Sequence, residues 1–155
     1  MDDVSTAIKQ LRDEKRFFHL FSQEELALLF PLFGMVHYPA KTTVFSEDEL
    51  VNVPFFVIYQ GSLEINKKTD FGRPYVLARI TRGSLMGQIS FTVSQNRATV
   101  SAVTIEDTDL LMMSADRVAA VLEKHPSIGV KLLREIIRVQ NIRMSELATR
   151  MTTTL

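Results

Sequence analysis

The side chains best suited to bind a metal ion are scattered along the sequence. The three histidines, His19, His37 and His125, fall in unrelated stretches, and the chain has no cysteine. Protein zinc sites gather histidine, cysteine or carboxylate ligands at characteristic short spacings. We therefore predict that the chain has no metal site.

The spacings typical of catalytic groups are also missing. Serine, histidine and aspartate all occur, but the sequence contains neither a nucleophile-elbow pattern nor His-Glu-x-x-His. The stretch Gly83–Gly87 lacks the Gly-Lys-Ser ending of a Walker phosphate-binding loop. We predict that the chain is not an enzyme.

Length and composition favour one globular domain over residues 1–155. The 18 basic and 18 acidic residues balance, whereas a dedicated nucleic-acid binder usually carries an excess of basic residues. The most apolar stretch, Phe17–Tyr38, is too interrupted to span a membrane. The start, Met-Asp-Asp, lacks the basic region of a signal peptide. The absence of cysteine suits a reducing compartment. We expect a cytoplasmic protein with no membrane partner.

Two helices are predicted before the first strand. Residues Ser5–Arg16 place Ile8 and Leu11 on one side of a short amphipathic helix. Ser22 and Glu25 then form a capping box, in which each side chain bonds the backbone N–H of the other residue. The second helix is expected from Gln23 to about Phe33.

Short strand-forming runs separated by turn signals occupy the middle of the chain. Gly61 divides two apolar runs between Pro54 and Ile65, and Asp70–Gly72 carries turn chemistry. Further strands are expected within Met35–Phe45, Tyr75–Ile80, Ala98–Val103 and Leu110–Met113. Many short strands at close spacing are typical of a roll or barrel. We predict an α+β fold, with a β-roll (a double-stranded jelly-roll barrel) at about residues 34–114. The roll is flanked by N-terminal helices and a long C-terminal helix.

Helical periodicity returns after Ser114, which is suited to cap a helix over Ala115–Glu123. The segment His125–Ser127 interrupts it, and a long helix follows from about Ser127 to Arg150. A seam with alternating spacings of three and four runs along this helix: Val130, Leu133, Ile137, Gln140, Met144, Leu147 and Met151. This is the heptad pattern of a coiled coil.

An adjoining face of the same helix is apolar too. It carries Leu132, Ile136 and Val139, which we expect to pack on the roll. One small domain cannot easily bury both faces, although the alternative is that both pack within one chain. We predict a homodimer with an interface formed by Leu133, Ile137, Gln140, Met144 and Leu147. Gln140, in the middle of the seam, would be a polar residue that fixes the register of the two paired helices.

Four segments in order resemble motifs of the cyclic-nucleotide-binding domain family, found in catabolite-activator regulators, kinase regulatory subunits and gated channels. Leu20–Leu26 resembles the entry helix, and Phe56–Gly61 the strand that ends in glycine. Arg82–Phe91 resembles the loop and short helix of the phosphate-binding cassette, and Ala98–Ala102 the strand leaving it. The resemblance covers about Phe17 to Leu147.

This resemblance implies a ligand pocket at the cassette and pairing of the long helix across a two-fold axis. In the family, backbone N–H groups at a helix N-terminus and an arginine bind the cyclic phosphate. A glutamate holds the ribose hydroxyl. The matching positions in this sequence are Met86, Gly87, Gln88, Ile89, Asn96, Arg97 and Ala98.

The charged pair of the family is replaced in this sequence. Gln88 stands at the glutamate position and Asn96 at the arginine position, while Arg97 lies one residue later. The apolar alternation over residues 98–102 turns Arg97 to the opposite face of the strand, unless a bulge or a shorter loop brings it back. Losing one charged hydrogen bond costs about 1.5–3 kcal/mol, or about tenfold to a hundredfold in affinity. Acidic residues 47–49, where the family has glycines, also disfavour an anion.

Two functions are consistent with these features. The first is a sensor, in which a nucleotide or another small anion enters the roll and biases the terminal helices. The second is an interaction scaffold without nucleotide. We expect a regulatory domain with no cofactor, in which binding of cyclic AMP and cyclic GMP is weak or lost. The alternative is a genuine cyclic-nucleotide or dinucleotide receptor that uses Gln88 and Arg97. Because only five residues follow the long helix, too few for a helix-turn-helix domain, we expect no DNA binding by this chain.

Overall fold

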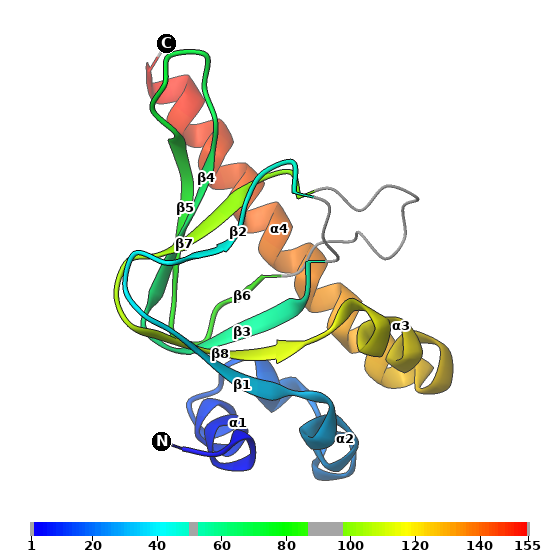
Figure 1. Cartoon of the computed structure of the whole chain (residues 1–155). Helices are drawn as coiled ribbons and strands as arrows, with labels where there is room; N and C mark the ends of the chain where they lie inside the picture. Colours follow the sequence, from blue (N-terminus) through cyan, green and yellow to red (C-terminus); the bar gives the residue numbers. More distant parts are fainter. Residues whose placement is uncertain (1, 50–52, 87–97, 155) are drawn as a thin grey trace.

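The computed structural model describes residues 2–49, 53–86 and 98–154 (Figure 1). Helices come first and last in the chain, and all the strands lie between them. The N-terminal helices are α1 (Val4–Asp13), η1 (Phe17–Leu20), α2 (Gln23–Leu29) and η2 (Phe30–Leu32). The strands are β1 (Gly34–Tyr38), β2 (Thr43–Phe45), β3 (Phe55–Gln60), β4 (Ser62–Lys67), β5 (Tyr75–Thr81), β6 (Leu85–Met86), β7 (Ser101–Thr104) and β8 (Thr108–Met113). The last helices are α3 (Ala115–Lys124) and α4 (Pro126–Thr154).

Local hydrogen bonds set the bounds of the N-terminal helices. The predicted capping box is confirmed, because Glu25 N–H donates to Ser22 Oγ at 3.1 Å and Ser22 N–H donates to Glu25 Oε1 at 2.9 Å. α1 ends at Asp13 rather than at Arg16, since Lys15 adopts a left-handed conformation with φ of 57°. α2 ends at Leu29, and a 3₁₀ turn follows, because Pro31 has no N–H to continue the helix.

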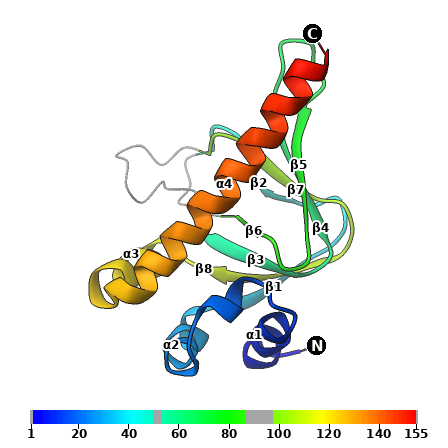
Figure 2. The same ribbon diagram turned by 180° about the vertical axis from the view of Figure 1, so that it is seen from behind.

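The strands form two antiparallel sheets of four, which confirms the predicted roll (Figure 2). The strand order is β1-β8-β3-β6 in one sheet and β2-β7-β4-β5 in the other. Gly61 stands where the chain passes from β3 in the first sheet to β4 in the second, with φ of +95°. A Cβ atom at this position would lie 2.4 Å from Thr108 Oγ1, so the crossing requires glycine.

Two cores share the two faces of β3, because successive side chains of a strand point to opposite sides. Phe55, Val57 and Tyr59 belong to the outer core, which the first sheet forms with the N-terminal helices, α3 and α4. Phe56 and Ile58 belong to the roll core, which lies between the sheets. All five side chains are buried. β3 therefore joins the helical layer to the roll.

The long helix α4 packs unevenly along its length. Ile128, Leu132 and Ile136 in its first half are buried in the outer core, and Val139 packs against that core. This confirms the predicted inner face. No described residue after Ile136 is fully buried. The far end of α4 lies beside the β4–β5 hairpin in both views (Figures 1 and 2). Among the described residues, no helix combines the length and hydropathy needed to cross a membrane.

Candidate functional site

Most of the predicted cassette lies outside the described residues. These positions are Gly87, Gln88, Ile89, Asn96 and Arg97.

The two described cassette residues flank that segment. Met86 is 5% exposed in β6, and Ala98 is 1% exposed ahead of β7. Ala98 pairs through its backbone with the loop before β3, since its N–H donates to Glu49 O at 3.1 Å and its carbonyl accepts from Asp48 N at 2.8 Å. Ala98 and Ala102 are both buried, but Thr99 and Val100 form a bend and β7 begins only at Ser101, so the predicted strand does not extend back to Ala98.

A small cavity lies between the roll and α4 at this point. Its volume is about 150 Å³. The roll contributes six of the lining residues, which are mostly apolar, and α4 contributes three: Ile65, Leu77, Ala78, Met86, Thr99 and Val100, then Gln140, Arg143 and Leu147. Because Met86 and Thr99, which stand before and after residues 87–97 in the sequence, both line this cavity, it is the candidate ligand site.

Arg143 supplies the positive charge of this cavity. Its Nη2 donates to Leu85 O at 2.6 Å, and its Nη1 lies 3.8 Å from Met86 Sδ. Burial lowers the pKa of this guanidinium, and Glu146, one turn further along α4, acts in the opposite direction. Arg143 was not predicted from the sequence, although its spacing of three from Gln140 and four from Leu147 places all of them on one side of a helix.

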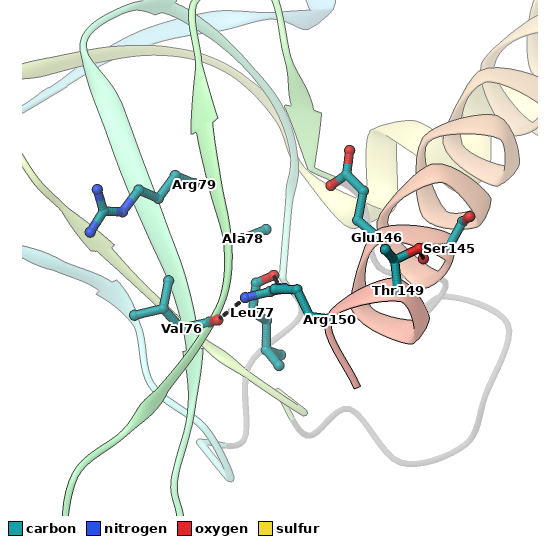
Figure 3. Close-up of a pocket in the computed structure, with 8 residues that line it drawn as sticks. All are labelled: Val76, Leu77, Ala78, Arg79, Ser145, Glu146, Thr149 and Arg150. Atoms are coloured by element: carbon teal, nitrogen blue, oxygen red, sulfur yellow. Dashed lines mark hydrogen bonds between the residues drawn. The ribbon is translucent and has the colours of Figure 1, made fainter. Parts of the chain in front are cut away.

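A second, wider cavity of about 660 Å³ separates β5 from the end of α4 (Figure 3). Arg150 crosses it, donating to Val76 O at 2.9 Å and also to Leu77 O. Ser145, Glu146 and Thr149 line its helical side, while Arg79 points away from α4 (Figure 3). Leu77 and Ala78 line both cavities. Arg150 therefore fastens the end of α4 to the strand that borders the candidate site.

The acidic loop before β3 keeps two of its carboxylates in local hydrogen bonds. Glu47 accepts from Lys68 N at 2.8 Å and from Lys67 Nζ at 3.2 Å. The Lys68 bond is the main cause that holds the pKa of Glu47 below its usual value. Glu49 accepts from Ser46 N at 2.9 Å. The charge of Glu47 is thus balanced at the β4–β5 hairpin.

The predicted seam of α4 divides into two sets. Ile137 and Met144 are 50% and 69% exposed, and Val130 and Met151 are exposed in line with them. Leu133 is half-buried. Gln140 and Leu147 instead line the candidate cavity. The exposed set repeats every seven residues, whereas Gln140 and Leu147 turn toward the roll.

The histidines do not converge. His37 Nδ1 lies 2.7 Å from Asp109 Oδ1 across the β1–β8 pair. Within the described part of the chain, no group of three or more histidine, cysteine, aspartate or glutamate side chains is placed to hold a metal ion.

Comparison with known proteins agrees with this architecture. A family model described as "Cyclic nucleotide-binding domain" matches residues 35–125, more than half of the chain. The cyclic AMP receptor protein of Thermus thermophilus is 25% identical over 121 residues, which make up 78% of this chain and 55% of that relative. The chain thus spans about half the length of this curated relative.

Two solved structures have the same fold. A cyclic nucleotide-binding domain from Methylobacillus flagellatus has a TM-score of 0.77 at 21% identity, over 87% of this chain and 75% of that one. The c-di-GMP-responsive regulator CLP of Xanthomonas campestris has a TM-score of 0.73 at 17% identity, over 82% and 61%.

Proposed function

The chain belongs to the cyclic nucleotide-binding domain family, and we propose that it is a non-catalytic regulatory module that pairs with a second copy through α4. The exposed stripe of α4 carries this proposal. Val130, Ile137, Met144 and Met151 are 46%, 50%, 69% and 65% exposed. Four large apolar side chains in a row are unusual on a free surface.

A second copy of the chain is the occupant that best fits this stripe. Its residues recur every seven positions, and a two-fold axis would bring two identical stripes together. Met144 and Met151 pack adaptably but specify a partner poorly. The helix alone would therefore pair weakly, with the centre of the interface around Ile137 and Met144. The roll must contribute contacts beside it.

We further propose that binding of cyclic AMP and cyclic GMP is weak. Gln88 and Asn96 are neutral where the family carries charge, and either change removes a charge-assisted hydrogen bond. One relative is named as a receptor for cyclic AMP, and one solved structure as responsive to c-di-GMP. The alternative therefore stays open: a cyclic-nucleotide or dinucleotide receptor with a rearranged pocket that uses Gln88 and Arg97.

The assembly is tested by the double substitution Ile137→Asp and Met144→Asp. It should give a folded monomer, because each carboxylate would be buried without a partner only in the dimer, at a cost of several kcal/mol. Light scattering reports the mass and circular dichroism reports the fold.

The matched control is Ile142→Asp. Ile142 is 44% exposed on the same helix, about 140° around it from Ile137 by helical geometry. This variant should remain dimeric. A wild-type chain that is monomeric at high concentration would contradict the proposal. A double variant that unfolds would show instead that the stripe belongs to the core of one chain.

A further inference from the structure

A groove separate from the candidate ligand site lies where the N-terminal helices, the turn between β5 and β6, and α4 meet. Its volume is about 390 Å³, and it shares no lining residue with the candidate site. Its floor is apolar, because Phe17 and Leu85 are buried in the outer core and Val139 packs against that core. Leu20, which also lines it, is 37% exposed. This N-terminal groove therefore leaves apolar surface partly uncovered.

Cationic and donor side chains surround this apolar floor. Lys15, Arg16, His19 and Arg138 line the N-terminal groove, and all four residues are exposed. Among the described residues that line it, Glu135 alone is acidic, and it pairs with Arg138. The groove thus carries an excess of positive charge, although the whole chain balances 18 basic against 18 acidic residues.

The neighbouring carboxylate of Glu14 does not use up this charge. Glu14 acts on Arg16 through its charge, but its hydrogen bonds go to Arg82: Oε1 accepts from Nε at 3.1 Å and Oε2 accepts from Nη2 at 2.6 Å. In the part of the chain that the structure describes, Lys15 and Arg16 form no side-chain hydrogen bond or ion pair. Their donors are therefore available to a partner.

The turn between β5 and β6 holds Arg16 in place. A Cβ atom built at Gly83 would lie 2.6 Å from Arg16 Cδ and 2.8 Å from Arg16 Cγ. The stem of Arg16 thus lies directly over the backbone of this turn, with its guanidinium at the groove. A cation that is positioned before binding loses less side-chain entropy when it meets an anion.

We propose that the N-terminal groove docks an acidic segment of a partner protein, in which an apolar side chain flanked by carboxylates packs over Phe17 and Val139. An apolar centre with a polar rim is the usual anatomy of a protein interface. The exposed rim favours a peptide over a small molecule, because pockets for small ligands bury most of the ligand surface. This surface goes beyond the self-pairing proposed above.

The N-terminal groove and the exposed stripe lie on opposite sides of α4. Glu135 and Val139 each stand two residues from Ile137, which places them about 160° around the helix from it. A dimer formed through the stripe would therefore leave the groove of each copy open.

The test selects short random peptides on the full chain, after depletion on Arg16→Glu has removed peptides that bind elsewhere. Enriched sequences should carry aspartate or glutamate on both sides of an apolar residue. Fluorescence anisotropy then measures one synthesised member of this set. Lys15→Glu should weaken its binding about tenfold, because a reversed charge at the rim replaces an attraction with a repulsion. Exchanging its carboxylates for amides, or raising the salt concentration, should also weaken binding.

Arg73→Glu is the matched control. It makes the same change of charge at an exposed position of the β4–β5 hairpin, whose tip lies at the other end of the molecule from α1 (Figures 1 and 2). This variant should bind the peptide as the wild type does. The double variant Ile137→Asp and Met144→Asp should bind it too, which separates failure of this proposal from failure of the proposed dimer.

Several results would overturn the proposal. No enriched peptide, enriched peptides without acidic residues, or equal affinity of the wild type and Lys15→Glu would each remove the electrostatic recognition. Free glutarate that displaces the peptide at equal concentration would make the groove a small-molecule site. A lower mass of Arg16→Glu than of the wild type in light scattering would identify a second copy as the occupant. If circular dichroism shows that Lys15→Glu is unfolded, Lys15→Gln gives the same comparison with a smaller effect.

Discussion

At the scale of single residues, Gly61 shows how closely the fold depends on one backbone conformation. Its φ of +95° lies in the left-handed region, and an added Cβ would lie 2.5 Å from Asp107 O and 2.7 Å from Thr108 Cα. These neighbours are backbone atoms of the turn before β8 and of β8 itself. They cannot move aside as a flexible side chain could.

Gly61→Ala should therefore destabilise the protein by about 2–5 kcal/mol, which combines the cost of the left-handed conformation with that of overpacking. Urea denaturation followed by circular dichroism measures this change. Gly34→Ala is the matched control, because nothing lies within 4 Å of a Cβ built at Gly34. That variant should stay within about 0.5 kcal/mol of the wild type. Equal denaturation midpoints for the two variants would contradict this account of the crossing.

At the scale of elements, α4 consists of a fixed half and a loosely held half. Burial of Leu132 and Ile136 fixes the first half to the outer core. The second half is attached through Arg143 and Arg150, seven residues apart, which bond carbonyl oxygens of β6 and β5. Hydrogen bonds at a partly solvated surface contribute less than a buried apolar face does.

Amide hydrogen exchange should distinguish the two halves. We expect stronger protection over residues 128–139 than over 142–152, and Arg150→Gln should speed exchange in the latter range severalfold. Arg134→Gln is the control. Arg134 is exposed, and no hydrogen bond or ion pair of its side chain occurs in the described part of the chain. Uniform protection along α4, or equal effects of the two variants, would contradict this division.

The elements themselves were largely predictable from the sequence. The capping box of α2, the break at Gly61 and the inner face of α4 each followed from short-range patterns, and the structure confirms them. Arg143 was not predictable, because the heptad pattern placed its neighbours Gln140 and Leu147 in an interface with a second copy. Periodicity shows which residues share a helical face, but it does not show which of two adjoining faces turns toward the sheet.

At the scale of the whole molecule, one ion pair joins the N-terminal helices to the last helix. Lys131 Nζ lies 2.6 Å from Glu25 Oε1, across 106 positions of sequence. The bond from Lys131 is the main cause that holds the pKa of Glu25 below its usual value of 4.5, and the bond from Ser22 N–H adds to it. The Glu25 side chain is 16% exposed and that of Lys131 is 40% exposed.

This pair makes folding stability depend on pH in a defined direction. A carboxyl whose pKa is lowered by folding contributes stability above its unfolded pKa, and that stability is lost as pH falls through the folded pKa. Glu25→Gln should therefore lower the free energy of unfolding by about 1 kcal/mol at neutral pH, after allowance for solvent screening. This difference in unfolding free energy between the variant and the wild type should become smaller below about pH 4.

Chemical denaturation at several pH values measures the Glu25 effect. Glu24→Gln is the control, since it removes the same charge from the neighbouring position while keeping the Lys131 contact. A deficit that is equal at every pH, or equal in both variants, would show that Glu25 does not provide the pH dependence.

The global arrangement was predictable only in outline. Alternating strands and a terminal amphipathic helix indicated a roll with helices packed on it. The pairing of β3 with both β8 and β6 joins segments far apart in sequence, and no local pattern specifies such partners. The contribution of β3 to both cores became clear only from its register. Both faces of this strand are apolar, so its sequence shows no alternation of apolar and polar residues.

The bond between Arg150 and β5 also affects how the protein behaves in concentrated solution. β5 is an outermost strand of its sheet, and such strands can pair with a strand of another molecule through their free backbone groups. Arg150 occupies the carbonyl oxygens of Val76 and Leu77 on this strand. Any movement that carries Arg150 away from β5 exposes that edge. The contact between α4 and β5 would therefore also protect this edge of the sheet against pairing with another molecule.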